Sequence, residues 1–259
     1  MKHNKLSAVL LTSGAFILLN ALAKKKAEQY DINDDNPYMD TSAEEYSDNK
    51  ECHSTYTAVV KPVIDKALSF LGLVLLSPVF LIIAILIFVD DPGPILFTQK
   101  RVGIGKTFFM LHKFRTMKMS TPHDVPTHLL SNPDQYITRM GQFLRKTSLD
   151  ELPQIWDIFR GKMSIIGPRP ALWNQEDLVS ERDKYGANDV LPGLTGWAQI
   201  NGRDELEIPV KAKLDGEYVK RMSLSFDIKC FIGTIFSVAK SDGVVEGGTG
   251  SIHKEETNQ

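Results

Sequence analysis

Apolar residues gather in two long stretches in the first third of the chain. The first, Leu6–Ala23, has lysines on both sides and contains a few polar residues. It is just long enough to cross a hydrocarbon core of about 30 Å, and it predicts an N-terminal anchor, a transmembrane helix within residues 1–26. The alternative is a cleaved signal peptide, because Ala21-Leu22-Ala23 resembles a peptidase site. The lysines that follow favour keeping that end of the segment inside.

The second stretch, Ala67–Val89, carries no charge and is interrupted by Ser77-Pro78. Proline lacks an N–H donor and clashes with the preceding turn, so a helix must bend there. Each half would be about 17 Å long, too short to cross a bilayer alone. The pattern leaves two interpretations open: a re-entrant helix-break-helix that enters and leaves one leaflet, or a kinked spanning helix. Basic residues on both sides favour two cytoplasmic ends, and the Ser77 hydroxyl is expected to bond a carbonyl freed by the break.

The rest of the chain divides into a linker, a folded domain and a tail. Residues 27–60 are acidic and without periodicity, which predicts a linker. Residues 61–247, which include the re-entrant segment 67–89, are expected to form one domain. Residues 248–259 are predicted to be a disordered tail. The linker contains no internal repeat.

Within the expected domain, short elements of both kinds are predicted. The apolar runs Ile95–Phe97 and Phe108–Leu111 flank a glycine-containing turn and predict strands. Gln142–Phe159 has a helical pattern that is interrupted around Leu149–Pro153. The later part of Tyr218–Val238 suits an amphipathic helix lying on a membrane or on the domain core. The fold class is therefore expected to be α+β and mostly helical.

Composition restricts the possible binding partners more than it restricts the fold. The net charge is −2, from 30 basic and 32 acidic residues, so bulk charge does not point to nucleic acid. The two cysteines, Cys52 and Cys230, support neither a disulfide framework nor a zinc cluster. Two free thiols fit a domain that faces the cytoplasm.

Candidate chemistry centres on the adjacent carboxylates Asp150 and Glu151, here called the acid pair. Adjacent acids repel, so a metal, a phosphate-rich ligand or a capping role is needed to retain them. Local sequence favours capping: Ser148 and Glu151 form a capping box, or Asp150 caps a helix that has Pro153 in its first turn. A carboxylate kept ionised at a helix start can also serve as a nucleophile or as a Mg²⁺ ligand, so the two roles are compatible.

A second candidate is Arg169, which lies between Pro168 and Pro170. The two prolines stiffen the backbone, so this arginine loses little entropy when it binds a phosphate through both of its outer nitrogens. Taken alone, the same pattern also fits a rigid turn with a solvated arginine.

Four motifs in one order carry a family resemblance. They are Lys113-Phe-Arg-Thr-Met, Arg145-Lys-Thr-Ser-Leu-Asp-Glu-Leu-Pro-Gln, Ser164-Ile-Ile-Gly-Pro-Arg-Pro and Pro192-Gly-Leu-Thr-Gly-Trp-Ala-Gln-Ile-Asn-Gly-Arg. From Lys61 to Val245 the chain resembles the bacterial sugar transferases, which are monotopic polyprenyl-phosphate phosphoglycosyl transferases. It departs from them in two places: residues 1–56 lack the four-helix bundle of larger members, and the loop Met119–Tyr136 has no clear family identity.

The resemblance implies a reaction in which a sugar-1-phosphate moves from a UDP-sugar to undecaprenyl (polyprenyl) phosphate and UMP is released through a covalent aspartyl intermediate. It favours the re-entrant interpretation and places the enzyme in the bacterial inner membrane, with its catalytic domain facing the cytoplasm and in contact with membrane lipids. Such a step begins exopolysaccharide, capsule, O-antigen or glycoprotein glycan synthesis. The implied residues are Asp150 and Glu151 as catalytic residues and Mg²⁺ ligands, Arg145, Arg169 and Lys113 as substrate-binding residues, and Ser77 and Pro78 at the helix break.

The alternative is a catalytically silent, membrane-anchored scaffold or regulator of glycan assembly. The sequence leaves open the sugar, the pathway, homo-oligomer formation and contacts with downstream glycosyltransferases.

Overall fold

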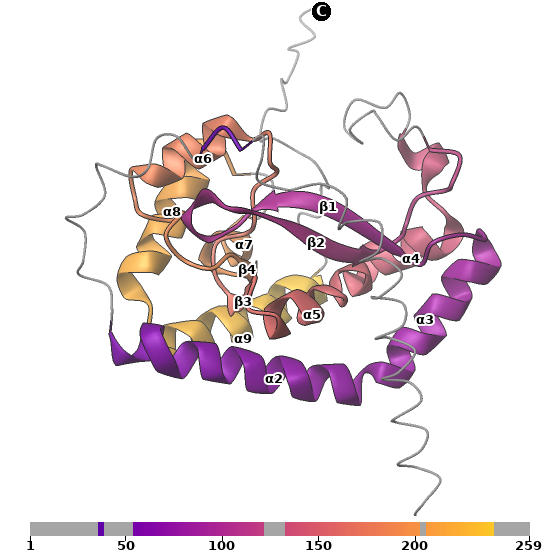
Figure 1. The fold of residues 1–259 in the computed structure, drawn as a ribbon, viewed down its shortest axis with the longest axis horizontal. Coiled ribbons are helices and arrows are strands. Elements are labelled where there is room, and N and C mark those ends of the chain that lie inside the picture. Colours follow the sequence, from indigo (N-terminus) through magenta and orange to yellow (C-terminus); the bar gives the residue numbers. More distant parts are fainter. Residues whose placement is uncertain (1–35, 39–53, 122–132, 203–205, 241–259) are drawn as a thin grey trace, which may run out of the picture.

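The computed structural model describes residues 36–38, 54–121, 133–202 and 206–240 (Figure 1). This part of the chain is mostly helical and has two small two-stranded sheets, so the α+β expectation is confirmed. The predictions for the anchor (1–26) and the tail (248–259), and most of the predicted linker, fall outside the described residues.

The chain enters the described domain through a bent helix pair. A π-helical turn, Tyr56–Val60, leads into α2 (Lys61–Leu75), and α3 (Ser77–Asp90) follows at an angle of 60°. Among the described residues no single helix is long and apolar enough to cross a membrane, whereas this pair passes that test of length and composition when taken together. The pair starts before Ala67, so Lys61 and Lys66, which were expected to precede it, lie inside α2, whereas Lys100 and Arg101 follow it in β1 (Leu96–Val102).

Pro78 explains the position of the bend. A proline N atom cannot donate to the carbonyl four residues earlier, which here belongs to Val74. The Ser77 hydroxyl donates to that same carbonyl at 2.8 Å. The predicted side-chain bond at the break is therefore confirmed, and the backbone oxygen that the proline leaves without its usual partner is satisfied within the chain.

One face of the helix pair packs on the domain and the other is exposed. Phe80, Ile83 and Ile87 of α3 are buried in a cluster with Phe114 and Leu144. The opposite faces of the two helices carry exposed large apolar side chains: Val63, Leu68, Phe70, Leu71, Leu75, Val79, Leu81, Ile82, Ile85, Leu86, Phe88 and Val89. So large an apolar surface is unusual for a protein that meets only water.

Two short sheets organise the domain. Strands β1 (Leu96–Val102) and β2 (Phe108–Phe114) form an antiparallel hairpin at the two predicted positions, each longer than expected. Strands β3 (Ser164–Ile166) and β4 (Gly193–Thr195) pair in parallel, and neither was predicted. A Cβ atom at Gly193 would lie 2.1 Å from the Gly167 backbone nitrogen, so glycine is needed there for the two chains to approach.

Helices surround these sheets. They are α4 (Arg139–Thr147), α5 (Gln154–Phe159), α6 (Glu176–Asp183), α7 (Trp197–Ile200), α8 (Ile208–Arg221) and α9 (Leu224–Lys240), with 3₁₀ turns at Ile104–Lys106 (η3), Pro133–Tyr136 (η5) and Leu149–Glu151 (η6). The predicted helical pattern with a break near Leu149–Pro153 is confirmed as α4, η6 and α5. In Figure 1, α2 and α9 lie along the same side of the molecule, and the β1–β2 hairpin lies farther from that side.

Candidate active site

The acid pair lies in η6, between α4 and α5. Ser148 ends α4 in the left-handed conformation (φ 55°), and the turn Leu149–Glu151 follows directly. The Ser148 side chain makes no capping bond, and the Ser148 backbone N–H donates to the Arg145 carbonyl oxygen. The predicted capping box is therefore wrong, because Ser148 closes the preceding helix instead of starting the next one from an extended conformation.

Glu151 brings two distant cations together. Its Oε1 accepts from Lys113 Nζ of β2 at 3.1 Å and from Arg169 Nη2, in the loop after β3, at 2.8 Å. Lys113 Nζ also lies 3.9 Å from Asp150 Oδ2. Strand β2 and the loop after β3, which are far apart in sequence, thus converge on the turn η6. Of the five predicted catalytic and substrate-binding residues, Lys113, Asp150, Glu151 and Arg169 are in direct charge contact.

These contacts decide the charge of Glu151. Burial alone would raise the pKa of the Glu151 carboxyl, but the charges of Arg169 and Lys113 and their hydrogen bonds outweigh burial. They hold the pKa well below its usual range. Glu151 is therefore an anion at neutral pH. Asp150, which is 4% exposed, lies beside the same lysine, with its Oδ2 3.9 Å from Lys113 Nζ.

Arg145 has a different immediate environment. It lies in the last turn of α4, where its Nε donates to Thr116 Oγ1 at 2.9 Å. The Thr116 carbonyl accepts from Thr138 N at 3.0 Å, and a Cβ at Gly141 would come within 2.1 Å of that same carbonyl oxygen. The segment just after β2 and helix α4 are therefore held in close contact, and Arg145 lies next to the residues that follow the strand carrying Lys113. Thr116 lies within the first quoted motif, but nothing in the sequence assigned it this contact.

The donor set for a metal ion is small. Among the described residues, no group of three or more His, Cys, Asp or Glu side chains could hold a metal ion. The acid pair offers two carboxylates, and Mg²⁺ is commonly held by one or two carboxylates together with substrate phosphates. These residues therefore fit Mg²⁺ when a phosphate-bearing substrate supplies the remaining ligands.

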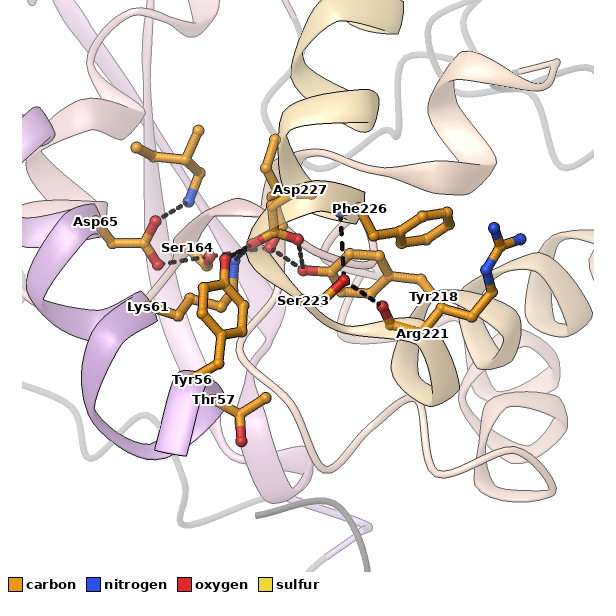
Figure 2. A network of polar contacts seen from close by, with 12 residues as sticks. Tyr56, Thr57, Lys61, Asp65, Ser164, Tyr218, Arg221, Ser223, Phe226 and Asp227 are labelled. Atoms are coloured by element: carbon orange, nitrogen blue, oxygen red, sulfur yellow. Dashed lines mark hydrogen bonds and ion pairs between the residues drawn. The ribbon is translucent and has the colours of Figure 1, made fainter. Parts of the chain in front are cut away.

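A buried polar network holds α2 against the rest of the domain (Figure 2). The Asp227 carboxylate of α9 accepts from Lys61 Nζ at 2.6 Å, from the Tyr56 hydroxyl at 2.6 Å and from the Tyr218 hydroxyl at 2.8 Å. Burial and the Asp227 charge raise the pKa of both tyrosines far above the ordinary value, so both remain donors. The start of the helix pair is thereby fixed to α8 and α9.

Asp65 extends this anchoring to the strand before Arg169. Its carboxylate accepts from Ser164 Oγ at 2.7 Å and from Ile165 N at 3.2 Å. Burial raises the pKa of Asp65, and the Lys61 charge and these hydrogen bonds offset only part of that effect. Neither Asp65 nor Asp227 was predicted from the sequence. A usable signal was the spacing of Lys61 and Asp65, one helical turn apart on the same face of α2.

Fold and site together define a class of protein: a small α+β domain that places an acid pair and two cations beside an exposed apolar helix pair. The sequence model of the family described as "Bacterial sugar transferase" matches residues 56–241, well over half of the chain. The chain belongs to this family, and the resemblance drawn from its four motifs is confirmed.

Curated relatives are similar over the same region. A "UDP-glucose:undecaprenyl-phosphate glucose-1-phosphate transferase" from Xanthomonas campestris pv. campestris is 38% identical over 192 residues, covering 71% of this chain and 39% of the relative. A protein of the same name from Escherichia coli K12 is 40% identical over 185 residues, covering 69% and 40%. The match to "Exopolysaccharide production protein ExoY" of Sinorhizobium fredii is 33% identical over 208 residues, covering 72% and 92%. The chain thus spans about two fifths of the first two relatives and nearly all of the third.

Proposed function

We propose that this protein transfers a sugar-1-phosphate from a UDP-sugar to undecaprenyl phosphate, releasing UMP, through a covalent intermediate on Asp150. The observation that carries the proposal is the shared contact at Glu151, where Lys113 and Arg169 meet beside a second carboxylate. Two cations that converge next to an ionised acid suit a substrate with a diphosphate group. The names of the relatives supply the same pair of substrates.

In the proposed reaction, a carboxylate oxygen of Asp150 attacks the β-phosphorus of the UDP-sugar. The bond from that phosphorus to the bridging oxygen breaks, and UMP leaves with the electron pair. An oxygen of the lipid phosphate then attacks the same phosphorus, the bond to Asp150 breaks, and the carboxylate is regenerated. Splitting one displacement into two is the usual advantage of covalent catalysis.

The side chains around Asp150 have distinct roles in this scheme. Lys113 and Arg169 hold the phosphates in line, and Arg145 approaches them from the end of α4. Lys113 Nζ lies 3.9 Å from Asp150 Oδ2, which is beyond the usual hydrogen-bond distance. Asp150 and Glu151 would hold Mg²⁺ together with the diphosphate, and the bound ion would neutralise phosphate charge.

The membrane arrangement follows from how the helix pair is held. Lys61, at the start of α2, pairs with Asp227 at 2.6 Å, and Asp91, after the end of α3, pairs with Arg115 at 3.1 Å. Both ends of the pair are therefore fixed to one domain, which supports the proposal that they lie on one side of a bilayer. With its exposed apolar faces and its bend of 60°, the pair is proposed to enter one leaflet and return. This would bring the acid pair to the depth of a lipid phosphate.

Helix α9 supports the same arrangement. Its outer face carries exposed apolar side chains at helical spacing: Leu224, Ile228, Phe231, Ile232, Ile235 and Phe236. Its inner face buries Phe226 and Cys230 in the domain. We propose that α9 lies in the membrane interface beside α2, which is the first of the two positions that the sequence left open. The cytoplasmic side of the inner membrane is where both substrates would be available.

The test is release of UMP by the purified protein in lipid nanodiscs that contain undecaprenyl phosphate. A panel of UDP-sugars that begins with UDP-glucose would identify the donor, and a scaffold without chemistry would release no UMP with any of them. With a donor labelled at the β-phosphate and no acceptor present, the protein itself is expected to become labelled. Asp150→Asn should abolish both labelling and turnover, while Asp177→Asn, at an exposed position of α6, should change neither. An Asp150→Asn enzyme with unchanged rate would overturn the nucleophile assignment.

A further inference from the structure

A buried pair lies directly behind the site and has no part in the proposed chemistry. His112 precedes Lys113 on β2, and Asp157 lies in α5, the helix that follows the acid pair. The Asp157 side chain is 1% exposed and that of His112 is 9% exposed. An apolar cluster of Phe109, Leu111, Ile158 and Met163 is built from the same two elements and from the residue that precedes β3. A carboxylate is costly to bury and is retained only where its partners are well placed.

The Asp157 carboxylate contacts His112 through both of its oxygens. Oδ2 accepts from the His112 backbone N–H at 2.9 Å, and Oδ1 lies 2.7 Å from His112 Nδ1. The first contact satisfies a strand N–H that points away from β1, at the edge of β2 where a further strand would otherwise bind. Asp157 therefore joins α5 to β2 by the backbone as well as by the side chain.

Two neighbouring residues of β2 thus contact the two ends of one short segment, residues 151–157. Lys113 reaches Glu151 at 3.1 Å, and His112 binds Asp157, which lies six positions further along. The segment between them contains Pro153, whose fixed φ restricts its freedom. The His112–Asp157 contact therefore joins the strand that carries Lys113 to the segment that carries the acid pair at a second point.

We propose that Asp157 and His112 are positioning residues, which hold β2 against segment 150–157 so that Lys113 stays within reach of both carboxylates. This inference rests on the proposed function for its kinetic consequence, though not for its structural one. Loss of the pair would let the acid pair shift relative to Lys113. A displacement of about 1 Å in an active site can cost about a hundredfold in rate.

The test compares Asp157→Ala with Asp157→Asn and with a matched control. Asp157→Ala removes both contacts and should lower kcat for UMP release at least about tenfold, with KM for the UDP-sugar changed less than about threefold. Asp157→Asn keeps an acceptor for the His112 N–H and should recover most of the loss. The control is Asp215→Ala, which breaks another buried ion pair, Arg182–Asp215, between α6 and α8. It should lower stability and leave kcat per folded molecule within about threefold of the parent protein.

A second readout does not depend on turnover. Lys113, whose side chain is 9% exposed, should react slowly with an amine-directed acylating reagent, as followed by mass spectrometry. Asp157→Ala should accelerate its labelling at least about tenfold, and Asp215→Ala should not. Unchanged labelling in Asp157→Ala, or equal effects of the two alanine variants, would overturn the positioning role. Absence of UMP release from the parent protein would overturn the proposed function, and the labelling result would then decide the positioning role alone.

Discussion

Replacement of Asp227 by alanine should be among the most destabilising single changes in the domain. The carboxylate accepts from Lys61, Tyr56 and Tyr218 within 2.8 Å, and the Lys61 and Asp227 side chains are 11% and 9% exposed. Removal of one partner from a buried ion pair costs about 3–5 kcal/mol, because the other charge stays buried without its counterion. At about 2–4 °C per kcal/mol for a domain of this size, the melting temperature should fall by roughly 6–20 °C.

Lys61→Met provides the comparison that separates charge from packing. It removes the cation and leaves the Asp227 carboxylate buried with both tyrosine hydroxyls still donating to it, so the loss should be smaller than for Asp227→Ala, which leaves the Lys61 charge and both hydroxyls without their acceptor. Thermal unfolding in one detergent, at one protein concentration, measures both variants, with Asp177→Ala at an exposed position of α6 as the control. If Asp227→Ala shifts the melting temperature by less than about 2 °C, or by less than Lys61→Met does, the network does not hold α2 in this way.

Three further outcomes are expected. The depressed pKa of Glu151 means that its stabilising contribution is complete above its ordinary value of 4.5 and is lost as pH falls toward the folded-state pKa. The difference in melting temperature between the parent protein and Glu151→Gln should therefore shrink below about pH 4.5; a difference that widens there would contradict the charge contacts. Ser77→Ala should cost about 1 kcal/mol, seen in chemical denaturation, because the Val74 carbonyl loses the hydrogen bond from the Ser77 hydroxyl. Chelation of Mg²⁺ should reduce UMP release to background, and added Mg²⁺ should restore it.

The features that sequence predicted well depend on local chemistry. Ser77-Pro78 predicted the bend and its side-chain bond, because a missing N–H affects only the turn before it. The hairpin was visible from two apolar runs around a turn. In contrast, the three-residue strands β3 and β4 are too short to show a period, and they exist because two distant glycine-containing segments fit together.

The site was predicted from its motifs and not from its contacts. Arg145, Asp150 and Glu151 are close in sequence, but the convergence of Lys113 and Arg169 on Glu151 depends on how β2 and the loop after β3 are placed by the whole fold. The capping box failed for the opposite reason: a locally favoured motif was overruled by the helix end that precedes it. Charged pairs such as Lys61–Asp227 join residues 166 positions apart, and one sequence holds no pattern at that range.

The shared contact at Glu151 makes phosphate binding an exchange. Lys113 and Arg169 already hold an anion, so an arriving phosphate must displace or share the glutamate oxygen that both cations contact. The net gain in the ground state is then small, since one charge-assisted contact replaces another. The gain becomes large only for a group that carries more negative charge than the carboxylate, as the UMP phosphate does when the bond from the β-phosphorus to the bridging oxygen breaks. Glu151 would thus compete with the substrate for Lys113 and Arg169, so that the site favours groups that carry more negative charge than a carboxylate.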